Sequence, residues 1–488
     1  MGRNSTEATP TMALGQFAAD LQSQNLPSEV TFKLGQLFLD YLRVASIGAR
    51  MPWSAWASSY QSRLGGQGRS NILFSRRTTN PVQAAFLNAT FAGSIDSDDT
   101  HVGSMLHPGA VVFSAALALA TDIGASGSRF LAAVAAGYEV MIRIALAIQP
   151  SHFQRGFQST ATCGGFGAAA AAAVLLNAEQ HVEQSVAQSL GIVASFAGGL
   201  TQFYQSGSTV KRIHAAHAAE CGVAAALLVS HGFSGPTDVL EGSNGFARAY
   251  ADHSDFGLLE RALGTNFRLM EVMVKGHACS ARVQAAVEAI LALAKSDPFD
   301  PSDIVSIHVG VPKVIIGRLT RPRPVDLQAA QMSLPFSVAL AVRKVSHDPG
   351  SAVLEIQDFE DGLRDNTVRA MEDRVHCEFD REVEARSTAE AVAAKVVMRF
   401  NSGRETSMFV DAPLGSPSRP VSHNHQVQRF RNELSRRLSP SACDSLITLS
   451  QRMGPLDSME RIVALLRPEG EGDVMSLDDQ QDKERDVR

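Results

Sequence analysis

The chain carries no block of basic residues. Lys and Arg number 44 against 50 Asp and Glu, so the formal net charge is −6 at pH 7. A nucleic-acid-binding surface gathers positive charge on one face, because its phosphate contacts need cations. The composition therefore predicts that neither DNA nor RNA is a partner.

Cysteine is scarce as well. The five cysteines are Cys163, Cys221, Cys279, Cys377 and Cys443, and none of them belongs to a Cys-x-x-Cys pair. An odd number of widely spaced cysteines argues against a disulfide framework and against a structural zinc site. This pattern is typical of a reducing compartment.

Long apolar segments are missing too. Residues 1–11 are polar and lack the apolar stretch of a secretory signal. No run reaches about 18 uninterrupted apolar residues, the length that spans a bilayer, and the Ala- and Gly-rich run 163–176 is too short and too weakly hydrophobic. We therefore expect a soluble protein with no membrane partner. Its expected location is the cytoplasm, with the mitochondrion as the alternative.

What is present is a globular composition. Hydrophobic residues make up 45% of the 488 residues and charged residues 19%, which is typical of a folded protein and not of a disordered one. A chain of this length exceeds what one compact core accommodates. Two domains are therefore expected, with three as the alternative.

The first 296 residues have the apolar spacing of α-helices. Apolar residues recur every three or four positions, and several runs are apolar on all sides or rich in Ala and Gly. Such helices pack tightly inside a bundle. We therefore predict a large all-α domain over residues 1–296. Its predicted helices span 12–26, 28–47, 81–93, 109–121, 127–149, 160–176, 182–197, 214–231 and 280–294.

The pattern changes near Asp297. Pro298 and Pro301 interrupt the helical spacing, and later segments alternate β-branched and polar residues as strands do. We therefore predict a smaller α+β domain over 297–412. After a Pro-containing linker, residues 413–467 return to helices of the helical domain, and 468–488 form an acidic, disordered tail. The predicted strands are 304–311, 393–400 and 406–410, with helices at 329–345 and 366–371.

A polar loop lies between two apolar helices at residues 96–108. It brings three carboxylates and two imidazoles close together in the sequence. Ionisable groups beside buried helices must be solvated, paired or hydrogen-bonded. One interpretation is a solvated loop whose aspartates cap the next helix. The alternative is a loop that serves catalysis or binding.

Two cationic segments precede other apolar runs. Lys211, Arg212 and His214 stand at the start of an Ala-rich helix, and Lys275 and His277 precede the next long helix. Backbone N–H groups at a helix start, together with cations, suit a carboxylate-bearing ligand. Each segment alone is more simply explained as a loop with solvated charges. Three polar loops that each lead into a buried helix favour a shared pocket.

Five separated segments carry a resemblance to a known family. They are 96–108, 155–162, 211–215, 240–242 and 330–335. In this order they resemble the MmgE/PrpD family, which includes 2-methylcitrate dehydratases, alkylcitrate dehydratases of fungal secondary metabolism and cis-aconitate decarboxylases. The resemblance covers residues 12–466. It implies a large all-α domain with a smaller α+β lid domain, a homodimer, an active site between the domains, and no metal or organic cofactor.

The resemblance also implies which residues form the site. Cationic side chains would neutralise the carboxylates of a small tricarboxylate by charge-assisted hydrogen bonds. His107 would transfer a proton, oriented by a neighbouring aspartate. The predicted catalytic residues are His107, Asp96, Lys211 and Lys275, and the predicted substrate-binding residues are Asp99, Thr100, His101, Gln158, Arg212, His214 and His277.

Two imidazoles that the resemblance implies are absent. Gln158 stands where many relatives have His, and an amide cannot transfer a proton at neutral pH. Ser280 and Gln284 occupy the neighbourhood of a second family His, while His277 is displaced toward Lys275. Both losses count against an unchanged decarboxylase mechanism. In its favour, residues 48–54 are similar to those of fungal cis-aconitate decarboxylases.

We therefore predict a lyase that acts on a citrate-type polycarboxylate. The first hypothesis is a hydro-lyase that dehydrates 2-methylcitrate or an alkylcitrate to the corresponding aconitate. The alternative is a carboxy-lyase that converts cis-aconitate to an itaconate-type product. A third hypothesis is a catalytically silent family member that acts as a binding protein, because Gln158 and Gln284 would then replace indispensable groups.

Overall fold

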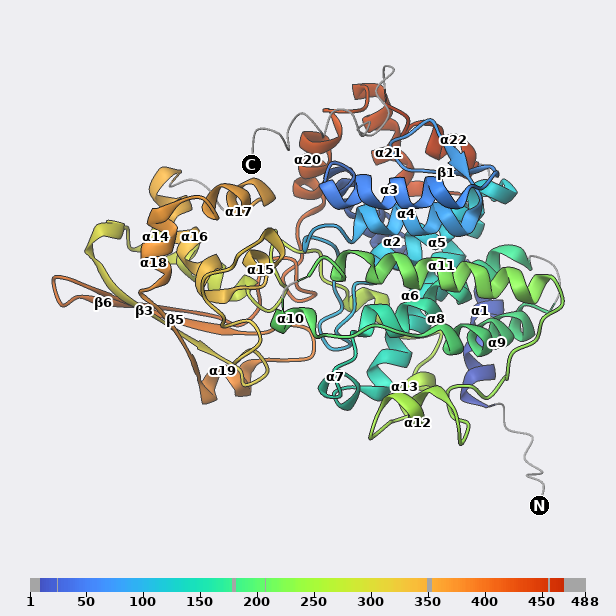
Figure 1. Cartoon of the computed structure of the whole chain (residues 1–488), viewed down its shortest axis with the longest axis horizontal. Coiled ribbons are helices and arrows are strands. Elements are labelled where there is room, and N and C mark those ends of the chain that lie inside the picture. Colours follow the sequence, from blue (N-terminus) through green and yellow to red (C-terminus); the bar gives the residue numbers. More distant parts are fainter. Residues whose placement is uncertain are drawn as a thin grey trace.

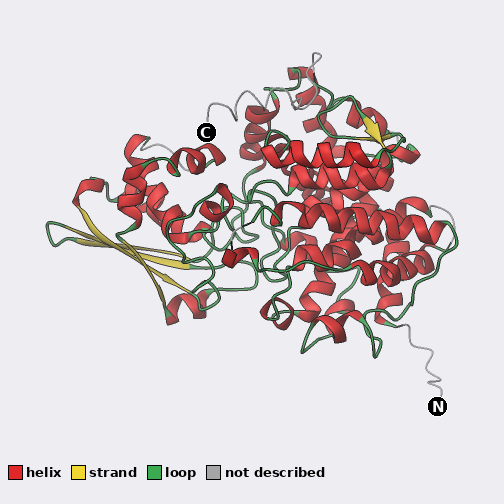
Figure 2. Ribbon diagram, in the orientation of Figure 1, coloured by secondary structure: helices red, strands yellow, loops and turns green. Residues whose placement is uncertain are grey.

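Two lobes of unequal size make up the protein, a large helical lobe and a smaller lobe built on a sheet (Figure 1). The computed structural model describes residues 9–23, 25–177, 181–206, 208–348, 353–454 and 457–468. Helices dominate both lobes, and one four-stranded sheet lies in the small lobe (Figure 2). The predicted fold class, mainly α with a smaller α+β part, is confirmed. The predicted acidic tail lies outside the described residues, apart from Pro468.

The large lobe contains most of the helices. They are α1 (Pro10–Ser23), α2 (Ser28–Gly48), α3 (Pro52–Leu64), α4 (Pro81–Ala92), α5 (Pro108–Ile123), α6 (Gly127–Ile148), α7 (Ser151–Gln154), α8 (Ser159–Leu176), α9 (Val182–Val193), α10 (Phe203–Ser206), α11 (Lys211–Ser230), α12 (Phe246–Tyr250), α13 (Gly257–Glu260), α20 (His423–Leu434), α21 (Pro440–Arg452) and α22 (Met459–Ala464), with the 3-10 helices η1 (Ala194–Phe196) and η2 (Arg268–Glu271). A short strand pair, β1 (Ser70–Asn71) and β2 (Thr78–Thr79), interrupts the part predicted as all-helical.

Helix α8 lies at the centre of the large lobe, packed against α5, α6, α9 and α11. Its Ala- and Gly-rich sequence allows the neighbouring backbones to approach closely. A Cβ atom added to Gly167 would lie 2.7 Å from the carbonyl oxygen of Gly137 on α6. These glycines therefore set the distance between two core helices.

Helices α4 and α5 hold the predicted acidic loop between them. Asn80 caps α4, because its side chain accepts a hydrogen bond from the N–H of Gln83. Gly124, with φ of 66°, ends α5 in the left-handed conformation that favours glycine. Both helices are buried along nearly their whole length, so the loop that joins them is held from two sides.

The small lobe is built on the sheet order β4-β3-β5-β6, in which β3 and β4 are parallel and the other pairs are antiparallel. Ile307 pairs with Met398 and Val309 with Val396, and all four side chains are buried under α14 and α16. The sequence did not predict β4, because this edge strand buries only its first residue well. The elements are α14 (Gln284–Ser296), η3 (Pro301–Asp303), β3 (Ile304–Val311), α15 (Leu327–Gln331), α16 (Leu334–His347), α17 (Ile356–Gly362), α18 (Asn366–Glu372), β4 (Val375–Phe379), α19 (Arg381–Arg386), β5 (Ala394–Phe400) and β6 (Glu405–Val410).

Helix α14 packs in the small lobe, although it precedes residue 297. Its apolar side chains, such as Val287 and Ile290, belong to the same hydrophobic core as the sheet. The change in sequence pattern marks the first strand, whereas helical spacing alone does not tell which core a helix covers. After the sheet, α20 and α21 pack against α2 in the large lobe.

Three helices, α6, α8 and α11, are long and apolar enough to cross a membrane by length and composition alone. This criterion is more permissive than the uninterrupted apolar run sought in the sequence. In the folded chain 94% of the most apolar window is buried inside the protein for α6 and for α8, and 50% for α11. Packing against other helices therefore accounts for the apolar character of α6 and α8.

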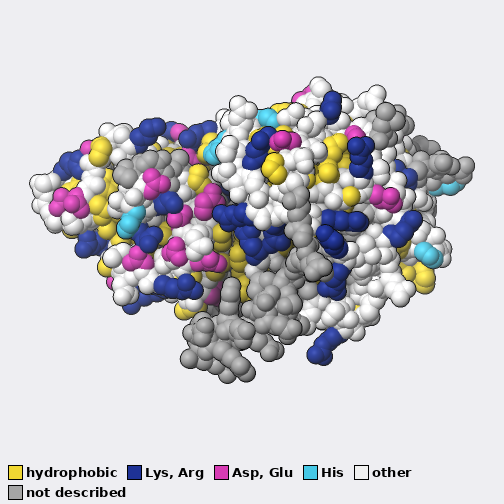
Figure 3. Space-filling model, turned by 90° about the horizontal axis from the view of Figure 1, so that it is seen from above, with side chains coloured by type: hydrophobic (Ala, Val, Ile, Leu, Met, Phe, Trp, Pro, Cys, Tyr) yellow, Lys and Arg dark blue, Asp and Glu magenta, His cyan; other side chains and the backbone are white. Residues whose placement is uncertain are grey.

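The two lobes meet where the acidic loop lies beside the chain segment that enters the small lobe. Thr100 and Met273 exchange two backbone hydrogen bonds, of 3.0 and 2.8 Å. Seen from above, Lys and Arg side chains gather along the junction of the lobes (Figure 3). A cavity of about 580 Å³ lies at this junction between α2, α17 and α20. Its lining includes Arg43, Arg50 and Arg429.

Candidate active site

A small cavity of about 40 Å³ lies at the junction, beside the acidic loop. This volume holds a few water molecules, so a larger ligand requires the lining side chains to move apart. The lining comes from loops far apart in the sequence. It consists of Asp96, Thr100, Val102, Met105, His107, Phe153, Gln158, Ser159, Tyr204, Lys211, Ser280, Ala281, Arg282 and Met332.

Asp96 binds two ammonium groups at once. Its Oδ2 accepts a hydrogen bond from Lys211 Nζ at 2.7 Å, and its Oδ1 accepts one from Lys275 Nζ. Burial would raise the pKa of Asp96, but the two lysines outweigh burial and hold this pKa well below its usual value. Asp96 is therefore ionised and joins α11 to the segment that enters the small lobe.

The two lysines differ in their environment. Lys275 is fully buried and also contacts Asp98 at 3.4 Å; burial lowers its pKa, the two aspartates raise it, and the net shift is upward. The Lys211 side chain is 10% exposed, and burial shifts its pKa downward despite the pair with Asp96. Lys211 is thus the lysine that faces the cavity, whereas Lys275 lies behind Asp96.

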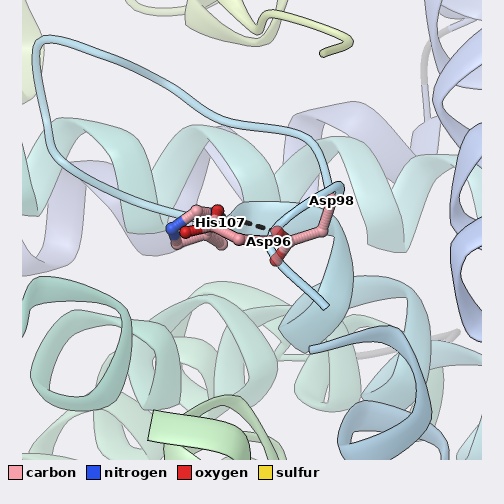
Figure 4. Close-up of side chains that lie close together, drawn as sticks. All are labelled: Asp96, Asp98 and His107. Atoms are coloured by element: carbon pink, nitrogen blue, oxygen red, sulfur yellow. Dashed lines mark ion pairs between the residues drawn. The ribbon is translucent and has the colours of Figure 1, made fainter. Parts of the chain in front are cut away.

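His107 is fixed at the start of α5 by acceptors around one ring nitrogen. Its Nδ1 lies 3.2 Å from Asp98 Oδ1, 3.2 Å from Thr100 Oγ1 and 3.2 Å from the carbonyl oxygen of Asp99. Figure 4 shows the His107 ring close to Asp96 and Asp98, which lie at the other end of the same loop. Because carboxylate and carbonyl oxygens only accept, Nδ1 carries a proton and Nε2 remains for a ligand.

Asp96, Asp98 and His107 also form a group of possible metal ligands, with one ligand atom of each within 4.8 Å of the others. Both oxygens of Asp96 already bind ammonium groups. A divalent cation would have to displace Lys211 and the buried Lys275. The donor set therefore does not fit a metal ion, and the expected absence of a metal remains a prediction.

Asp99 lies outside the cavity and anchors the loop. Tyr138 donates its hydroxyl to Oδ2 at 2.7 Å, and the N–H of Gly109 donates to Oδ1 at 2.8 Å. Burial raises the pKa of Asp99 to about 7. These bonds tie the acidic loop to α5 and α6, so the structure brings Asp99 to the helix core and not to the ligand side.

His101 and His277, predicted as substrate-binding, are buried in loop contacts away from the cavity lining. His101 Nε2 lies 3.1 Å from Glu271, and its Nδ1 accepts the N–H of Ser104. His277 Nδ1 accepts the N–H of Leu354 at 3.1 Å, and burial lowers the pKa of His277 to about 3. Both imidazoles hold the backbone in place.

Arg212 and His214 stand in the first turn of α11 but point away from the cavity lining. The Arg212 guanidinium lies over the Trp53 ring, 4.7 Å from its centroid, and is 2% exposed. His214 packs edge-on against Phe203, and burial lowers its pKa to about 4. Lys211 and His214 are three residues apart on one side of the helix, but of the three residues only Lys211 lines the cavity.

Gln158 does line the cavity, as predicted, and also caps a helix. Its Oε1 accepts the N–H of Ala161 at 2.7 Å and so begins α8, which leaves the amide Nε2 for a ligand. Gln284 lies elsewhere: its amide binds the backbone of His277 and Cys279 and fixes that loop. Among the predicted site residues, the cavity therefore unites Asp96, Thr100, His107, Gln158 and Lys211.

Four polar residues that line the cavity are not among the predicted site residues: Ser159, Tyr204, Ser280 and Arg282. Arg282 forms no ion pair with a carboxylate among the described residues, and burial lowers its pKa. A single Arg within the apolar run before α14 was a usable signal. Tyr204, on the short helix α10, had none, because α10 reaches the cavity only through the tertiary fold. The remaining lining is apolar and consists of Val102, Met105, Phe153, Ala281 and Met332.

Comparisons with known proteins identify the family of the chain. The MmgE/PrpD N-terminal domain matches residues 12–259, and the MmgE/PrpD C-terminal domain matches residues 277–453. The cis-aconitate decarboxylase-like protein oryM of Aspergillus oryzae is 26% identical, over 90% of this chain and 93% of its own. The cis-aconitate decarboxylase of Aspergillus terreus is 27% identical (86% and 88% covered), and that of Homo sapiens is 24% identical (93% and 94% covered). The chain therefore belongs to the MmgE/PrpD family.

Proposed function

We propose that the protein is a lyase that removes carbon dioxide from an unsaturated tricarboxylate of the cis-aconitate type. One observation carries the proposal: among the described residues that line the cavity, His107 is the single imidazole. Decarboxylation requires one proton transfer, to carbon, whereas dehydration requires a base and an acid. The similarity to cis-aconitate decarboxylases points in the same direction.

The charges around the cavity support binding of a polycarboxylate. Arg282 and Lys211 face the cavity, and Arg282 has no carboxylate partner among the described residues. A guanidinium offers two parallel N–H groups to a carboxylate, so Arg282 suits one substrate carboxylate and Lys211 a second. The amide of Gln158 and the hydroxyl of Ser280 add neutral hydrogen-bonding groups. This replaces the sequence-based assignment of Lys275, which lies behind Asp96.

The apolar side chains in the lining suit the departing carboxylate. A carboxylate that loses its hydration loses stabilisation of its charge, and this favours the release of carbon dioxide. In a β,γ-unsaturated acid the electrons of the broken C–C bond form a new double bond. The electrons of the old double bond then take a proton at the far carbon. His107 Nε2 delivers that proton, and the carboxylate next to this carbon is held by a cation such as Arg282.

Asp98 and Thr100 act on His107 as positioning residues. Their contacts with Nδ1 hold the ring, and the Asp98 carboxylate stabilises the imidazolium that donates the proton. After the transfer, Nε2 is neutral and Nδ1 keeps its proton. Solvent then restores the proton on Nε2 once the products leave.

Dehydration of citrate, 2-methylcitrate or an alkylcitrate, the first hypothesis from the sequence, is the second candidate. Tyr204 supports it, because its side chain lines the same cavity as His107 and offers a second proton-transfer group. Burial raises the pKa of Tyr204 to about 12, which favours the protonated phenol that could assist a leaving hydroxide. Tyr204 would then act as acid and His107 as base.

A direct assay separates the candidates. The purified protein is incubated with cis-aconitate, citrate, 2-methylcitrate and an alkylcitrate, while carbon dioxide and the absorbance of unsaturated acids are followed. Carbon dioxide from cis-aconitate that disappears in His107→Gln supports the decarboxylase. Absorbance that rises from a hydroxy acid supports the dehydratase. If the protein binds these acids without either signal, it is the silent binding protein. The homodimer also remains a prediction, which sedimentation tests.

A further inference from the structure

A second cavity adjoins the active-site cavity and is larger, about 260 Å³. Tyr204 and Met332 line both cavities, and Arg318 of the second lies over the ring of Phe153 of the first, 4.6 Å from its centroid. We call the second cavity the arginine chamber, since it is lined by Arg318, Arg321 and Arg323. The short helix α10, between the two lobes in Figure 1, forms part of its wall.

Two of the three guanidinium groups have no carboxylate partner among the described residues. Arg321 donates to the carbonyl oxygens of Tyr204 and Gln205, the latter at 2.9 Å, and Arg318 contacts only the face of an aromatic ring in the described contacts. Arg323 is paired with Asp373 at 3.0 Å. The chamber thus carries positive charge that the protein itself leaves largely unbalanced.

The lining contains one carboxylate, that of Asp326, against the two unpaired guanidinium groups. Its Oδ1 accepts the N–H of Ala329 at 2.7 Å and caps α15. Arg282 adds a further guanidinium group on the side of the active-site cavity. Arg318 and Arg282 are close enough to repel each other, and this repulsion helps to lower the pKa of Arg282. An oxyanion placed between them would relieve the repulsion.

We propose that the arginine chamber is a subsite for an oxyanion-bearing arm of the substrate, one that extends beyond the three carboxylates held at the reacting centre. This inference rests on the proposed function, because it takes the adjoining cavity as the place of reaction. The natural substrate would then be a tricarboxylate with an additional carboxylate or phosphate arm. Its anionic end would bind Arg318 and Arg321.

Calorimetric titration with unreactive acids tests the proposal. The probes are propane-1,2,3-tricarboxylate, butane-1,2,3,4-tetracarboxylate, and the tricarboxylate extended by an ethyl group. A charge-assisted hydrogen bond is worth enough for a gain of about tenfold in affinity. We therefore expect the tetracarboxylate to bind about tenfold more tightly than the tricarboxylate, and the ethyl-extended acid to gain nothing. A matching phosphate-terminated acid distinguishes a phosphate arm from a carboxylate arm.

Val325 provides a variant that leaves the fold intact. It lines the chamber and is 88% exposed. Val325→Glu places a negative charge there and should abolish the gain of the tetracarboxylate, whereas Val325→Gln, of the same size, should retain it. Val305→Glu, on the 53% exposed Val305 of β3, controls for net charge and should also retain the gain.

The outcomes separate this inference from the proposed function. Equal affinity for the tricarboxylate and the tetracarboxylate would overturn the chamber, even in a protein that decarboxylates cis-aconitate. A gain with the ethyl arm instead would also overturn it, because the chamber would then be an apolar subsite. A third outcome is a protein that has no lyase turnover but binds the tetracarboxylate more tightly, with this gain lost in Val325→Glu. That outcome would support the chamber and overturn the proposed function.

Discussion

Replacing Lys275 by Met tests whether this lysine stabilises the fold or binds the substrate. Lys275 is fully buried and shared between Asp96 and Asp98, whose side chains are 3% and 10% exposed. Methionine has a similar stem but no charge, so Lys275→Met leaves two buried carboxylates short of a counter-charge. Removing one partner of a buried ion pair typically costs about 3–5 kcal/mol. We expect the lower end, about 3 kcal/mol, because Asp96 keeps Lys211.

The assay is unfolding in urea, followed by tryptophan fluorescence at equilibrium. Lys344→Met is the matched control, because Lys344 pairs with Asp358 in the small lobe with side chains 23% and 13% exposed. A partly exposed pair of that kind contributes about 0–1 kcal/mol. The pair Asp96→Asn with Lys275→Met should cost less than the sum of the two single changes, because both remove the same interaction.

The expected result also distinguishes Lys275 from Lys211. Lys211→Met should weaken binding of a tricarboxylate more than it lowers stability, because Lys211 reaches the cavity. If Lys275→Met unfolds at the same urea concentration as Lys344→Met, then Lys275 does not hold Asp96 in place and the account of the buried pair is wrong. The account would also be wrong if Lys275→Met were as stable as the unchanged protein but failed to bind substrate.

His107→Gln should lower turnover by about two to four orders of magnitude with little change in affinity, as measured by kcat and by calorimetry; unchanged turnover would contradict the role of His107. Burial lowers the pKa of His152 to about 4, so the unfolded chain binds its proton first as pH falls. Stability should therefore be lost between pH 6.5 and 4, by up to about 3 kcal/mol, and His152→Gln should flatten this loss in urea titrations at each pH. Gly167→Ala would push a Cβ against the Gly137 carbonyl and should cost about 1–3 kcal/mol in thermal or urea unfolding, whereas a neutral effect would show that α6 and α8 can separate.

Local sequence patterns predicted most of the long helices and three of the four sheet strands, because apolar spacing and capping residues act within a few positions. Helix α3 was not predicted. The helix predicted at 81–93 is α4, which Asn80 caps, and the strand predicted at 304–311 is β3. Local patterns did not predict features that depend on neighbouring elements of the fold. Strand β4 is held by parallel pairing with β3 and not by its own alternation, and α14 packs on the sheet although its spacing resembles that of the bundle helices.

The sequence by itself determined the mainly α fold class, the family, and the set of loops that carry charged side chains. Which of those side chains share a cavity was decided only by the tertiary structure. Lys211, Arg212 and His214 lie within one helical turn, yet only Lys211 faces the cavity, because the direction of each side chain depends on how α11 packs. Arg282 and Tyr204 come to His107 from distant segments, and no local pattern encodes a contact between residues that only the packing of two lobes brings together.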